Sequence, residues 1–389
     1  MARPGEPDVY HADVVIAGAG PAGSTAALVL ARQGFSVLLL DKASFPRKKL
    51  CGGLLTWKAM RLLERLHGCP AQTLIEEGIV DTVTDGFALY YRGSLLSSGR
   101  FAYPFHLVKR PVFDNHLLTL AQKAGARILP DCEVLRCSPE GTLSTNQGDF
   151  RGRYVIGADG VNSTVRKCFR LPRARWNSNL AAAIEITVPR DAIPRITDHP
   201  ELHAGILATG YGWVFPNQEG IVLGICGLRR RSENFRETFL DFLRRIDVSD
   251  PENLIHNHPL KGHPIPYGNA LDNPTLANTL LAGDAGGYAD PLLGEGIFYA
   301  LLTGWYAGEA VAEALKKNEE PGQTYRARIS RYVMPEMRGA NRLRWLLYGL
   351  NILNPENLGR YFRLRGSTLA EMVHGMRSYN WGRKKQWDF

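Results

Sequence analysis

The chain has 389 residues, 44 % of them hydrophobic, which is ordinary for a globular protein. Its length predicts two or three domains, and the lack of a run of about 20 apolar residues argues against a transmembrane helix. The net charge of +9 is concentrated near the C-terminus, because thirteen Lys or Arg residues face four Asp or Glu residues from Arg326 onwards. Such a basic end suits nucleic acid, anionic lipid or an acidic protein, or it is a solvated face.

About a dozen residues precede the first expected strand, and they have the plan of neither a signal peptide nor a transit peptide. We therefore expect the protein to start near Met1 and to stay in the cytoplasm. None of the six cysteines forms a C-x-x-C pair, so no zinc site, iron–sulfur cluster or other metal is predicted. Scattered cysteines are usually reduced and buried, and we make an exception only for Cys51.

The stretch DVVIAGAGPAGSTAALVLARQGFSVLLLDK has the plan of a dinucleotide-binding unit. It predicts a strand over residues 14–17, a glycine-rich turn, an alanine-rich helix and a second strand over residues 36–40. In the turn, Gly18 allows a tight bend, Gly20 lets the backbone approach a pyrophosphate, and Gly23 lets helix and strand pack closely.

The residues that follow complete this fingerprint. The amino end of the helix, at Ala22, favours an anionic diphosphate. Asp41 ends the second strand about twenty residues on and can accept hydrogen bonds from an adenosine ribose. A lone glycine fingerprint is weak evidence, but the full order of strand, glycines, helix, strand and acid predicts that the unit binds a dinucleotide.

The next segment, PRKKLCGGLL, places a cysteine beside two glycines. Gly52 and Gly53 let the backbone come very close to something flat or bulky. Taken alone, the segment is a tight loop with Cys51 as a buried thiol.

Two stretches are rich in expected strands and differ in this from the dinucleotide-binding unit. Residues 84–107 contain aromatic strands split by a Gly-Ser turn, and residues 172–274 contain strand-like runs around one helix, ENFRETFLDFLRRI.

Within the second of these stretches, GYGWVFPNQEGIVLGICG predicts an aromatic hairpin. Tyr211, Trp213 and Phe215 fall at every second position, so their rings point to one face of a strand. The pattern alone leaves two interpretations open: an ordinary sheet core, or the wall of a ligand site.

Two further segments each predict a strand that ends in glycine and aspartate. YVIGADGVNSTVRK places Asp159 after its strand, and LLAGDAGGYADPLLGEGIFYALLTG places Asp284 there and enters a helix through Gly296 and Ile297. Together with the first fingerprint, these segments resemble the paired motifs of the flavoprotein hydroxylase superfamily, which holds FAD. The resemblance implies that Asp284 bonds the ribityl chain and that the Gly296 and Ile297 backbone faces the pyrimidine side of the flavin.

The same resemblance assigns two residues that pattern alone does not. Arg110, in VKRPVFDNHLL, matches an arginine that reaches FAD; by pattern it is a surface charge before a helix. Val134, in CEVLRC, matches the position where the backbone meets adenine; by pattern it is plain strand core.

The expected fold class is α/β: a Rossmann-like FAD-binding domain with an inserted antiparallel β-sheet substrate domain and a helical C-terminal region. The expected FAD-binding domain is discontinuous and comprises residues 1–83, 108–171 and 275–315. The sheet domain comprises residues 84–107 and 172–274, and the basic helical region comprises residues 316–389.

A narrower resemblance comes from CGG after the second strand, YGWVFP in the inserted sheet and GDAGG…DPLLGEGI. These are similar to the signature segments of the geranylgeranyl reductase family. That family often has a proline shortly before the tyrosine of the aromatic strand, and this chain has none shortly before Tyr211. The resemblance implies an enzyme that hydrogenates isolated double bonds of a prenyl chain with reduced FAD. Tyr211 and Trp213 would wall an oily chamber, and Cys51 would contact or orient the substrate.

The expected partners follow from this interpretation. The substrate is a prenyl lipid or quinone, which could be an archaeal-type lipid, a menaquinone side chain or the chlorophyll alcohol tail. Electrons come from NADPH or a ferredoxin-like protein, and no nucleic acid is expected. The basic, aromatic-rich segment RWLLYGLNILNPENLGRYFRLRG could lie on anionic lipid, which would place the protein at the inner face of the cell membrane.

Two other hypotheses remain. The first is a flavin monooxygenase or halogenase of the same superfamily; halogenases use a dedicated lysine and a Trp-x-Trp-x-Ile-Pro strand, whereas this chain has Tyr211 and Phe215 at the first and fifth positions. The second is a prenyl-binding escort protein without flavin, against which the intact glycine fingerprint, Asp41 and Asp284 argue.

Overall fold

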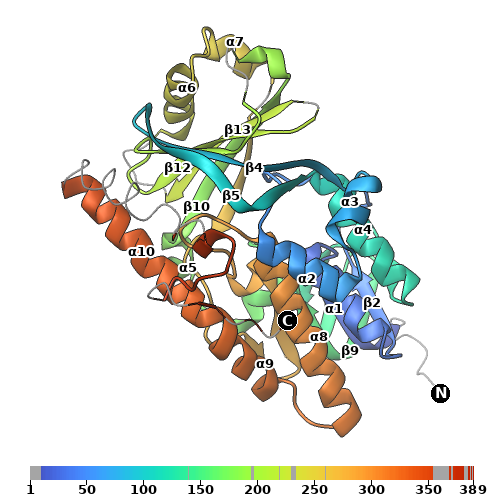
Figure 1. Ribbon diagram of the computed structural model, residues 1–389. Helices are drawn as coiled ribbons and strands as arrows, with labels where there is room; N and C mark the ends of the chain where they lie inside the picture. The colour runs from blue at the N-terminus through green and yellow to red at the C-terminus, as the bar shows by residue number, and fades with distance from the viewer. Residues whose placement is uncertain are drawn as a thin grey trace.

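The computed structural model describes residues 10–138, 140–193, 197–218, 220–228, 234–258, 260–353, 368, 371–380, 384, 385, 387 and 389. Within these residues the chain forms two eight-stranded sheets, with helices packed against both (Figure 1). The predicted α/β fold class is confirmed: a Rossmann-like domain, a second sheet and a helical C-terminal region are all present.

The first sheet has a parallel centre in the strand order β16, β9, β1, β2, β6. These strands are β1 (Tyr10–Ala17), β2 (Val37–Leu40), β6 (Arg127–Leu129), β9 (Gly148–Gly157) and β16 (Thr279–Leu281). Antiparallel additions at its edges are β7 (Val134–Cys137), β8 (Thr142–Thr145) and β15 (Thr275–Leu276). The strands β1 and β2 end in the buried runs VVIA and VLLL, as is typical of parallel strands covered on both faces.

Helices pack against one another over the first sheet and at its border with the second sheet. They are α1 (Pro21–Ala31), α2 (Trp57–His67), α3 (Ala71–Glu76), α4 (Arg110–Lys123), α8 (Ile297–Lys317) and α9 (Gly322–Arg328), with 3-10 turns at Val165–Phe169 and Gly283–Gly286. Every residue of α1 is buried, because the helix contacts α4, α8 and the sheet. A Cβ atom at Gly304 of α8 would lie 2.2 Å from the carbonyl oxygen of Ala22, so this glycine permits the close packing of α8 on α1.

The second sheet joins strands from two separate stretches of the chain, in the order β14, β10, β13, β12, β11, β4, β5, β3. Its strands are β3 (Leu54–Leu55), β4 (Val80–Tyr91), β5 (Ser94–Val108), β10 (Leu180–Val188), β11 (Glu201–Ala204), β12 (Gly210–Pro216), β13 (Ile221–Leu228) and β14 (Lys261–Pro266). All neighbouring pairs are antiparallel except β4 with β11. That parallel pair, where the two stretches meet, is a difference from the antiparallel sheet expected from the sequence.

One face of the second sheet is covered by α6 (Phe235–Arg245) and α7 (Pro251–Asn257), as Figure 1 shows at the top of the molecule. The side chain of Asn234 accepts hydrogen bonds from the first turn of α6, which explains why this predicted helix begins there. Phe239 and Phe242 of α6 are fully buried against Val214 and Ile225 of the sheet. The opposite face of the sheet is therefore left to face the first domain.

The C-terminal region runs through a π-helical turn at Ile329–Val333 into the long helix α10 (Met334–Leu353), which lies along the side of the molecule in Figure 1. Glu336 of α10 accepts hydrogen bonds from Ser378 and the Tyr379 backbone, which fastens the chain end to the helix. The expected basic helical end over residues 354–367 lies outside the described residues. In the described part of the chain, no helix has both the length and the apolar character needed to cross a membrane.

Short elements complete the described chain: the helix α5 (Arg173–Ser178) and a 3-10 turn at Arg190–Ala192.

Candidate cofactor and substrate cavity

Four predicted site residues follow the carboxyl ends of adjacent parallel strands. Gly18 follows β1, Asp41 follows β2, Asp159 closely follows β9, and Asp284 closely follows β16. Parallel neighbours end at the same edge of a sheet, and ligands of doubly wound sheets bind outside that edge, where the strand order reverses. The topology therefore brings together residues that are far apart in the sequence.

A cavity of about 1040 Å³ opens at this edge and continues beneath the second sheet. The predicted site residues on its wall are Gly18, Gly20, Ala22, Asp41, Cys51, Gly52, Gly53, Arg110, Val134, Asp159, Tyr211, Trp213, Asp284, Gly296 and Ile297. Gly23 is absent from the wall, because it packs beneath the turn: a Cβ atom there would lie 1.8 Å from the carbonyl oxygen of Gly18.

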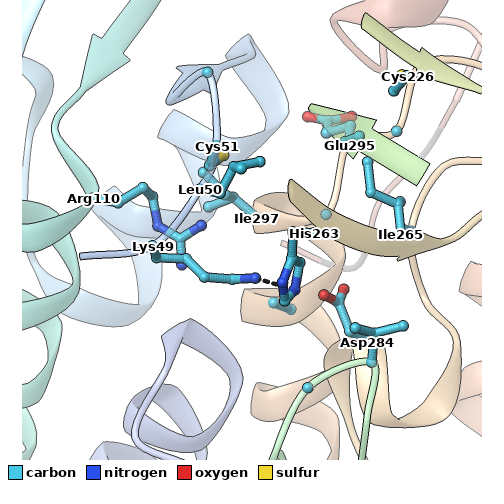
Figure 2. Close-up of a pocket in the computed structure, with 18 of the residues that line it drawn as sticks. Lys49, Leu50, Cys51, Arg110, Cys226, His263, Ile265, Asp284, Glu295 and Ile297 are labelled. Atoms are coloured by element: carbon cyan, nitrogen blue, oxygen red, sulfur yellow. Dashed lines mark hydrogen bonds between the residues drawn. The ribbon is translucent and has the colours of Figure 1, made fainter. Parts of the chain in front are cut away.

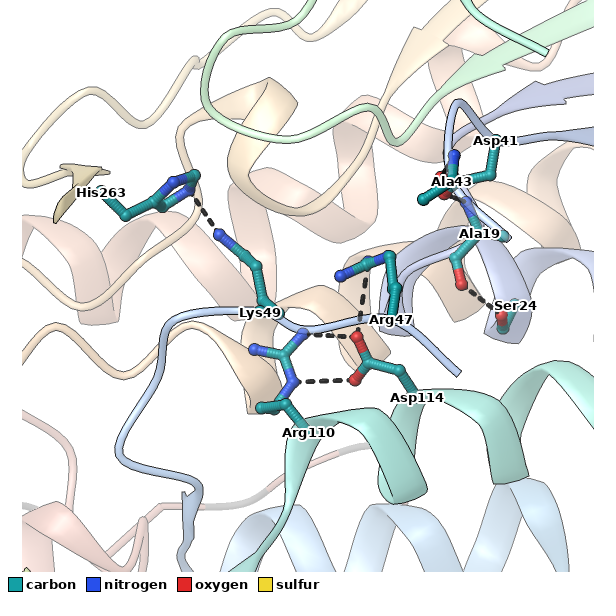
Figure 3. Close-up of polar contacts among 9 residues, drawn as sticks. All are labelled: Ala19, Ser24, Asp41, Ala43, Arg47, Lys49, Arg110, Asp114 and His263. Carbon is teal, nitrogen blue, oxygen red and sulfur yellow. Dashed lines mark hydrogen bonds and ion pairs between the residues drawn. The ribbon is translucent and has the colours of Figure 1, made fainter. Parts of the chain in front are cut away.

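The glycine-rich turn is held tightly from both sides. Gly18 has a φ of +95°, and a Cβ atom there would lie 2.3 Å from the carbonyl oxygen of Ala158. The Asp41 carboxylate accepts hydrogen bonds from the backbone N–H of Ala19 at 2.7 Å and of Ala43 at 2.9 Å (Figure 3). Asp41 thus braces the turn in addition to any contact it makes with a ribose.

The edge of the sheet also carries a carboxyl oxygen that has no partner among the described residues. One Asp159 oxygen accepts hydrogen bonds from the N–H groups of Thr164 and Val165, whereas the other is buried and has no partner in the described part of the chain. Burial raises the pKa of both Asp159 and Asp284 above the ordinary aspartate value. The amino end of α8, at Gly296, has no side-chain cap.

These features fit FAD, the cofactor predicted from the sequence. The amino end of α1, which begins after Gly20 and has no side-chain cap, suits a diphosphate. The unpaired Asp159 oxygen and the half-buried Asp284 carboxyl group can accept hydrogen bonds from hydroxyl groups of a bound cofactor. The uncapped amino end of α8 suits a ring system that carries negative charge when reduced.

Arg110 is part of a buried ion-pair network at the cavity wall, so the alternative of a surface charge is wrong. Its side chain is 8 % exposed and makes two hydrogen bonds of 2.8 Å to Asp114, which is fully buried. Arg47 pairs with the same carboxylate at 3.4 Å (Figure 3). Sequence reasoning did not identify Arg47 or Asp114.

The Cys-Gly-Gly loop crosses from the first domain to the second sheet, and the protein itself supplies the bulky neighbours that its glycines predict. A Cβ atom at Gly52 would lie 2.5 Å from the Phe215 ring. Gly53 has a φ of +72°, and its Cβ atom would lie 2.0 Å from the Val108 carbonyl oxygen. Cys51 is thereby held at the boundary between the two parts of the cavity.

The aromatic strand is β12, and its three alternating rings all line the cavity. The Tyr211 hydroxyl donates a hydrogen bond to the carbonyl oxygen of Leu293, in the loop that leads to α8. The Trp213 indole N–H is buried and has no partner in the described part of the chain. Other apolar residues of this part of the wall are Phe87, Leu89, Phe101, Phe105, Leu202 and Leu292.

The cavity also contains ionisable residues that sequence reasoning missed, and Figure 2 shows several of them around Cys51 and Asp284. Lys49 and His263 are in direct contact; burial lowers the pKa of Lys49 to about 8 and that of His263 to about 4. Burial raises the pKa of Glu185 to about 7 and also raises that of Glu295. A usable signal existed for Glu185, which is the one acid in the apolar strand AAAIEITV.

Comparison with known proteins identifies the family of the chain. A family model described as "FAD binding domain" matches residues 11–334. The chain is 32 % identical to an uncharacterized protein of Methanosarcina barkeri, with 87 % of this chain and 84 % of the relative covered. It is 31 % identical to the menaquinone reductase of Mycolicibacterium smegmatis, with 77 % and 76 % covered. It is 26 % identical to digeranylgeranylglycerophospholipid reductase 1 of Methanococcoides burtonii, with 79 % and 76 % covered.

Solved structures show the same fold. A geranylgeranyl bacteriochlorophyll reductase-like protein from Thermoplasma acidophilum has a TM-score of 0.69 at 22 % identity, with 96 % of this chain and 90 % of that chain covered. The flavin-dependent brominase Bmp2 has a TM-score of 0.68 at 18 % identity, with 94 % and 92 % covered. At these identities the likeness establishes the fold alone.

Proposed function

The chain belongs to the FAD-binding domain family and to the geranylgeranyl reductase group within it, and we propose that it hydrogenates isolated double bonds of a prenyl chain on a lipid or quinone. It is an FAD-dependent oxidoreductase. One observation carries the proposal: a single cavity runs from the glycine-rich turn at Gly18 to an apolar chamber under Tyr211, Trp213 and Phe215. Both the cofactor and a long hydrocarbon would contact that continuous wall.

The cavity wall has a cofactor-binding part and an apolar part, and this arrangement supports alkene reduction. FAD, when bound and reduced, supplies a hydride equivalent. An isolated alkene has no carbonyl group for an acid to polarise, so the protein must act mainly by positioning and by excluding water. The rings of β12 and the apolar residues of β4 and β5 do both, because they surround the chamber with largely apolar side chains. The two relatives named as reductases point to quinone and lipid substrates.

The alternative is an oxygen-dependent halogenase or monooxygenase, and one observation favours it: the half-buried Lys49 lines the cavity. Against it, β12 has Tyr211 and Phe215 where the halogenase pattern has tryptophan and isoleucine.

The proposal is tested with purified holoprotein under anaerobic conditions. A geranylgeranyl-bearing glycerophospholipid and a menaquinone are incubated with dithionite, with NADPH or with reduced ferredoxin, and the products are analysed by mass spectrometry. We expect the gain of one H₂ for each reduced double bond. Oxygen-dependent hydroxylation, or halogenation when halide and air are added, with no anaerobic reduction, would refute the proposal. The three reductants separately identify the electron donor.

We expect Cys51→Ala to retain FAD and to lose alkene reduction by about tenfold or more, or to redistribute the double bonds that are reduced, because small errors in positioning have large effects on rate. Cys51 lies on the cavity wall beside Gly52, next to both the cofactor end and the aromatic chamber. Cys69→Ala is the matched control, because Cys69 is buried away from the cavity. An unchanged rate and product pattern in Cys51→Ala would remove the thiol from the mechanism.

We also propose that the basic C-terminal region brings the protein to the inner face of the cell membrane. Trp345 and Leu346 of α10 are 67 % and 53 % exposed, and they lie in the part of the chain that accounts for its net positive charge. We expect the double substitution of both residues by glutamate to weaken sedimentation with phosphatidylglycerol vesicles, whereas Leu95→Glu, at an exposed position of β5, has no effect. Equal binding of all three proteins would contradict a membrane contact through α10.

A further inference from the structure

Glu185 is a buried acid on the cavity wall with half of its carboxyl group unused. It lies on β10 and is 7 % exposed. One carboxyl oxygen accepts a hydrogen bond of 3.1 Å from the backbone N–H of Cys51. The other is buried and has no partner in the described part of the chain. An unpaired carboxyl oxygen costs free energy unless a ligand or a proton uses it.

The register of the second sheet places Glu185 in one cross-strand row with Trp213 of the aromatic strand. Glu185 pairs with Gly224 of β13, and Gly224 pairs with Trp213 of β12. A Cβ atom at Gly224 would lie 2.2 Å from the Trp213 ring, so the indole lies over this glycine, in the gap between its own strand and β10. The indole N–H, a second polar atom without a partner among the described residues, is therefore buried in the same row of the wall.

This row meets the Cys-Gly-Gly loop. A Cβ atom at Gly52 would lie 3.6 Å from the Trp213 indole nitrogen, and Glu185 holds the neighbouring Cys51 N–H. The loop and the row together form the boundary between the cofactor edge and the apolar chamber. A carboxyl group here can reach a hydrocarbon in that chamber, and the aromatic rings around it exclude bulk water as a proton source.

We propose that Glu185 is the proton donor in alkene reduction. This inference rests on the proposed function. One alkene carbon gains a hydride equivalent from the reduced cofactor, the other gains the proton of the Glu185 carboxyl group, and the π bond is replaced by two C–H bonds. After the product leaves, the carboxylate regains a proton from water that enters the emptied cavity. NADPH, or two molecules of a reduced ferredoxin-like protein together with protons from water, then supplies the two electrons that restore the reduced cofactor.

The surroundings of Glu185 suit an acid that works near neutral pH. Burial raises its pKa to about 7, and the N–H of Cys51 and nearby cations oppose that rise. The ionisable groups that face it from the loop, from α4 and from the neighbouring strand β14 are Lys49, Cys51, Arg110, Lys261 and His263. Because the acid form is the active one, the rate is expected to be highest below pH 7 and to fall as the pH rises above it.

The test compares the holoprotein with Glu185→Gln, which keeps the shape and removes the proton. We expect alkene reduction to fall by about 100-fold or more, since general acids contribute about 10²–10⁴-fold, while FAD absorbance and stoichiometry stay the same. Glu185→Asp, which retains an acid, is expected to regain part of the rate. Glu201→Gln is the control: Glu201 is also a buried acid of this sheet, but it lies outside the cavity wall and contacts His203.

A readout that does not depend on turnover is the infrared carboxyl band of the holoprotein. The wild type and Glu201→Gln are expected to show a band that titrates near pH 7, and Glu185→Gln is expected to lack it. If the wild type reduces prenyl chains and Glu185→Gln is equally active, Glu185 is not the proton donor, but the proposed function stands. A difference spectrum between the wild type and Glu185→Gln that contains no carboxyl band titrating near pH 7 would lead to the same conclusion. A wild type that reduces no prenyl substrate would overturn both this inference and the proposed function.

Discussion

Gly18→Ala is expected to yield a folded but colourless protein that no longer binds FAD. The φ of +95° at this position strains any residue with a side chain by about 1–3 kcal/mol. The new Cβ atom would also lie 2.3 Å from the Ala158 carbonyl oxygen, a contact with backbone that cannot swing aside. The turn must therefore move, and with it the Ala19 N–H that Asp41 holds. Together these effects predict a loss of FAD affinity of about 100-fold or more, measured by fluorescence titration of the apoprotein.

A control variant at a second glycine distinguishes the effect of the steric clash from that of the backbone strain. Gly125 follows α4 and has a φ of +109°, but a Cβ atom there would meet nothing within 4 Å. We expect Gly125→Ala to lower thermal stability slightly and to bind FAD as the wild type does. Full FAD binding by Gly18→Ala would mean that the turn tolerates a shift, and the account of the fingerprint as a tightly braced cradle would be wrong.

The fingerprint was predictable because its physics is local. Gly18, Gly20 and the strand before them form one continuous turn, and Asp41 reaches that turn because β1 and β2 are neighbouring strands joined by one helix. Asp159 and Asp284 could be placed at the same edge for a similar reason, since each follows a strand of the same parallel sheet. The resemblance to known families added which cofactor the edge holds.

The partners of the ionisable residues around the chamber were not predictable, because distant pairings bring these residues together. Glu185 meets the Cys51 loop only through the position of β10 in the second sheet, and His263 reaches Lys49 from β14. The same limit of local sequence applies to Gly52. The Gly-Gly pair predicts a bulky neighbour, but which residue that is, the Phe215 ring, depends on the register of β12. No local pattern around these residues encodes those partners.

A buried ion pair connects the two glycine-containing segments of the cavity wall. Lys58 of α2 is 1 % exposed and lies 2.7 Å from Glu295, in the segment that enters α8. Glu295 also accepts a hydrogen bond of 2.6 Å from Thr56, which lies just after the Cys-Gly-Gly loop. The Lys58 ammonium group donates a further hydrogen bond to the Val373 carbonyl oxygen and lies over the Phe298 ring. The pair thus ties the loop to the amino end of α8.

Lys58→Met is accordingly expected to lower the free energy of unfolding by about 3–5 kcal/mol, because it leaves the Glu295 carboxylate buried without its cation. Burial raises the pKa of Glu295, and Lys58 opposes that rise. A carboxyl group with a raised pKa stabilises the fold when protonated, and this contribution is lost as the pH rises through its folded pKa. Without Lys58 the pKa rises further, so the deficit in urea unfolding should be larger at mildly alkaline than at mildly acidic pH.

The double variant Lys58→Met/Glu295→Leu tests whether the unpaired charge is the cause. Replacing both ions by apolar side chains removes the desolvation penalty, so we expect it to recover much of the lost stability. FAD retention should follow, because Gly296 and Ile297 directly succeed Glu295 and line the cavity. If the double variant were as unstable as Lys58→Met at every pH, the loss would instead come from the missing contacts of the lysine with Val373 and Phe298, and the ion pair would not be what holds the loop against α8.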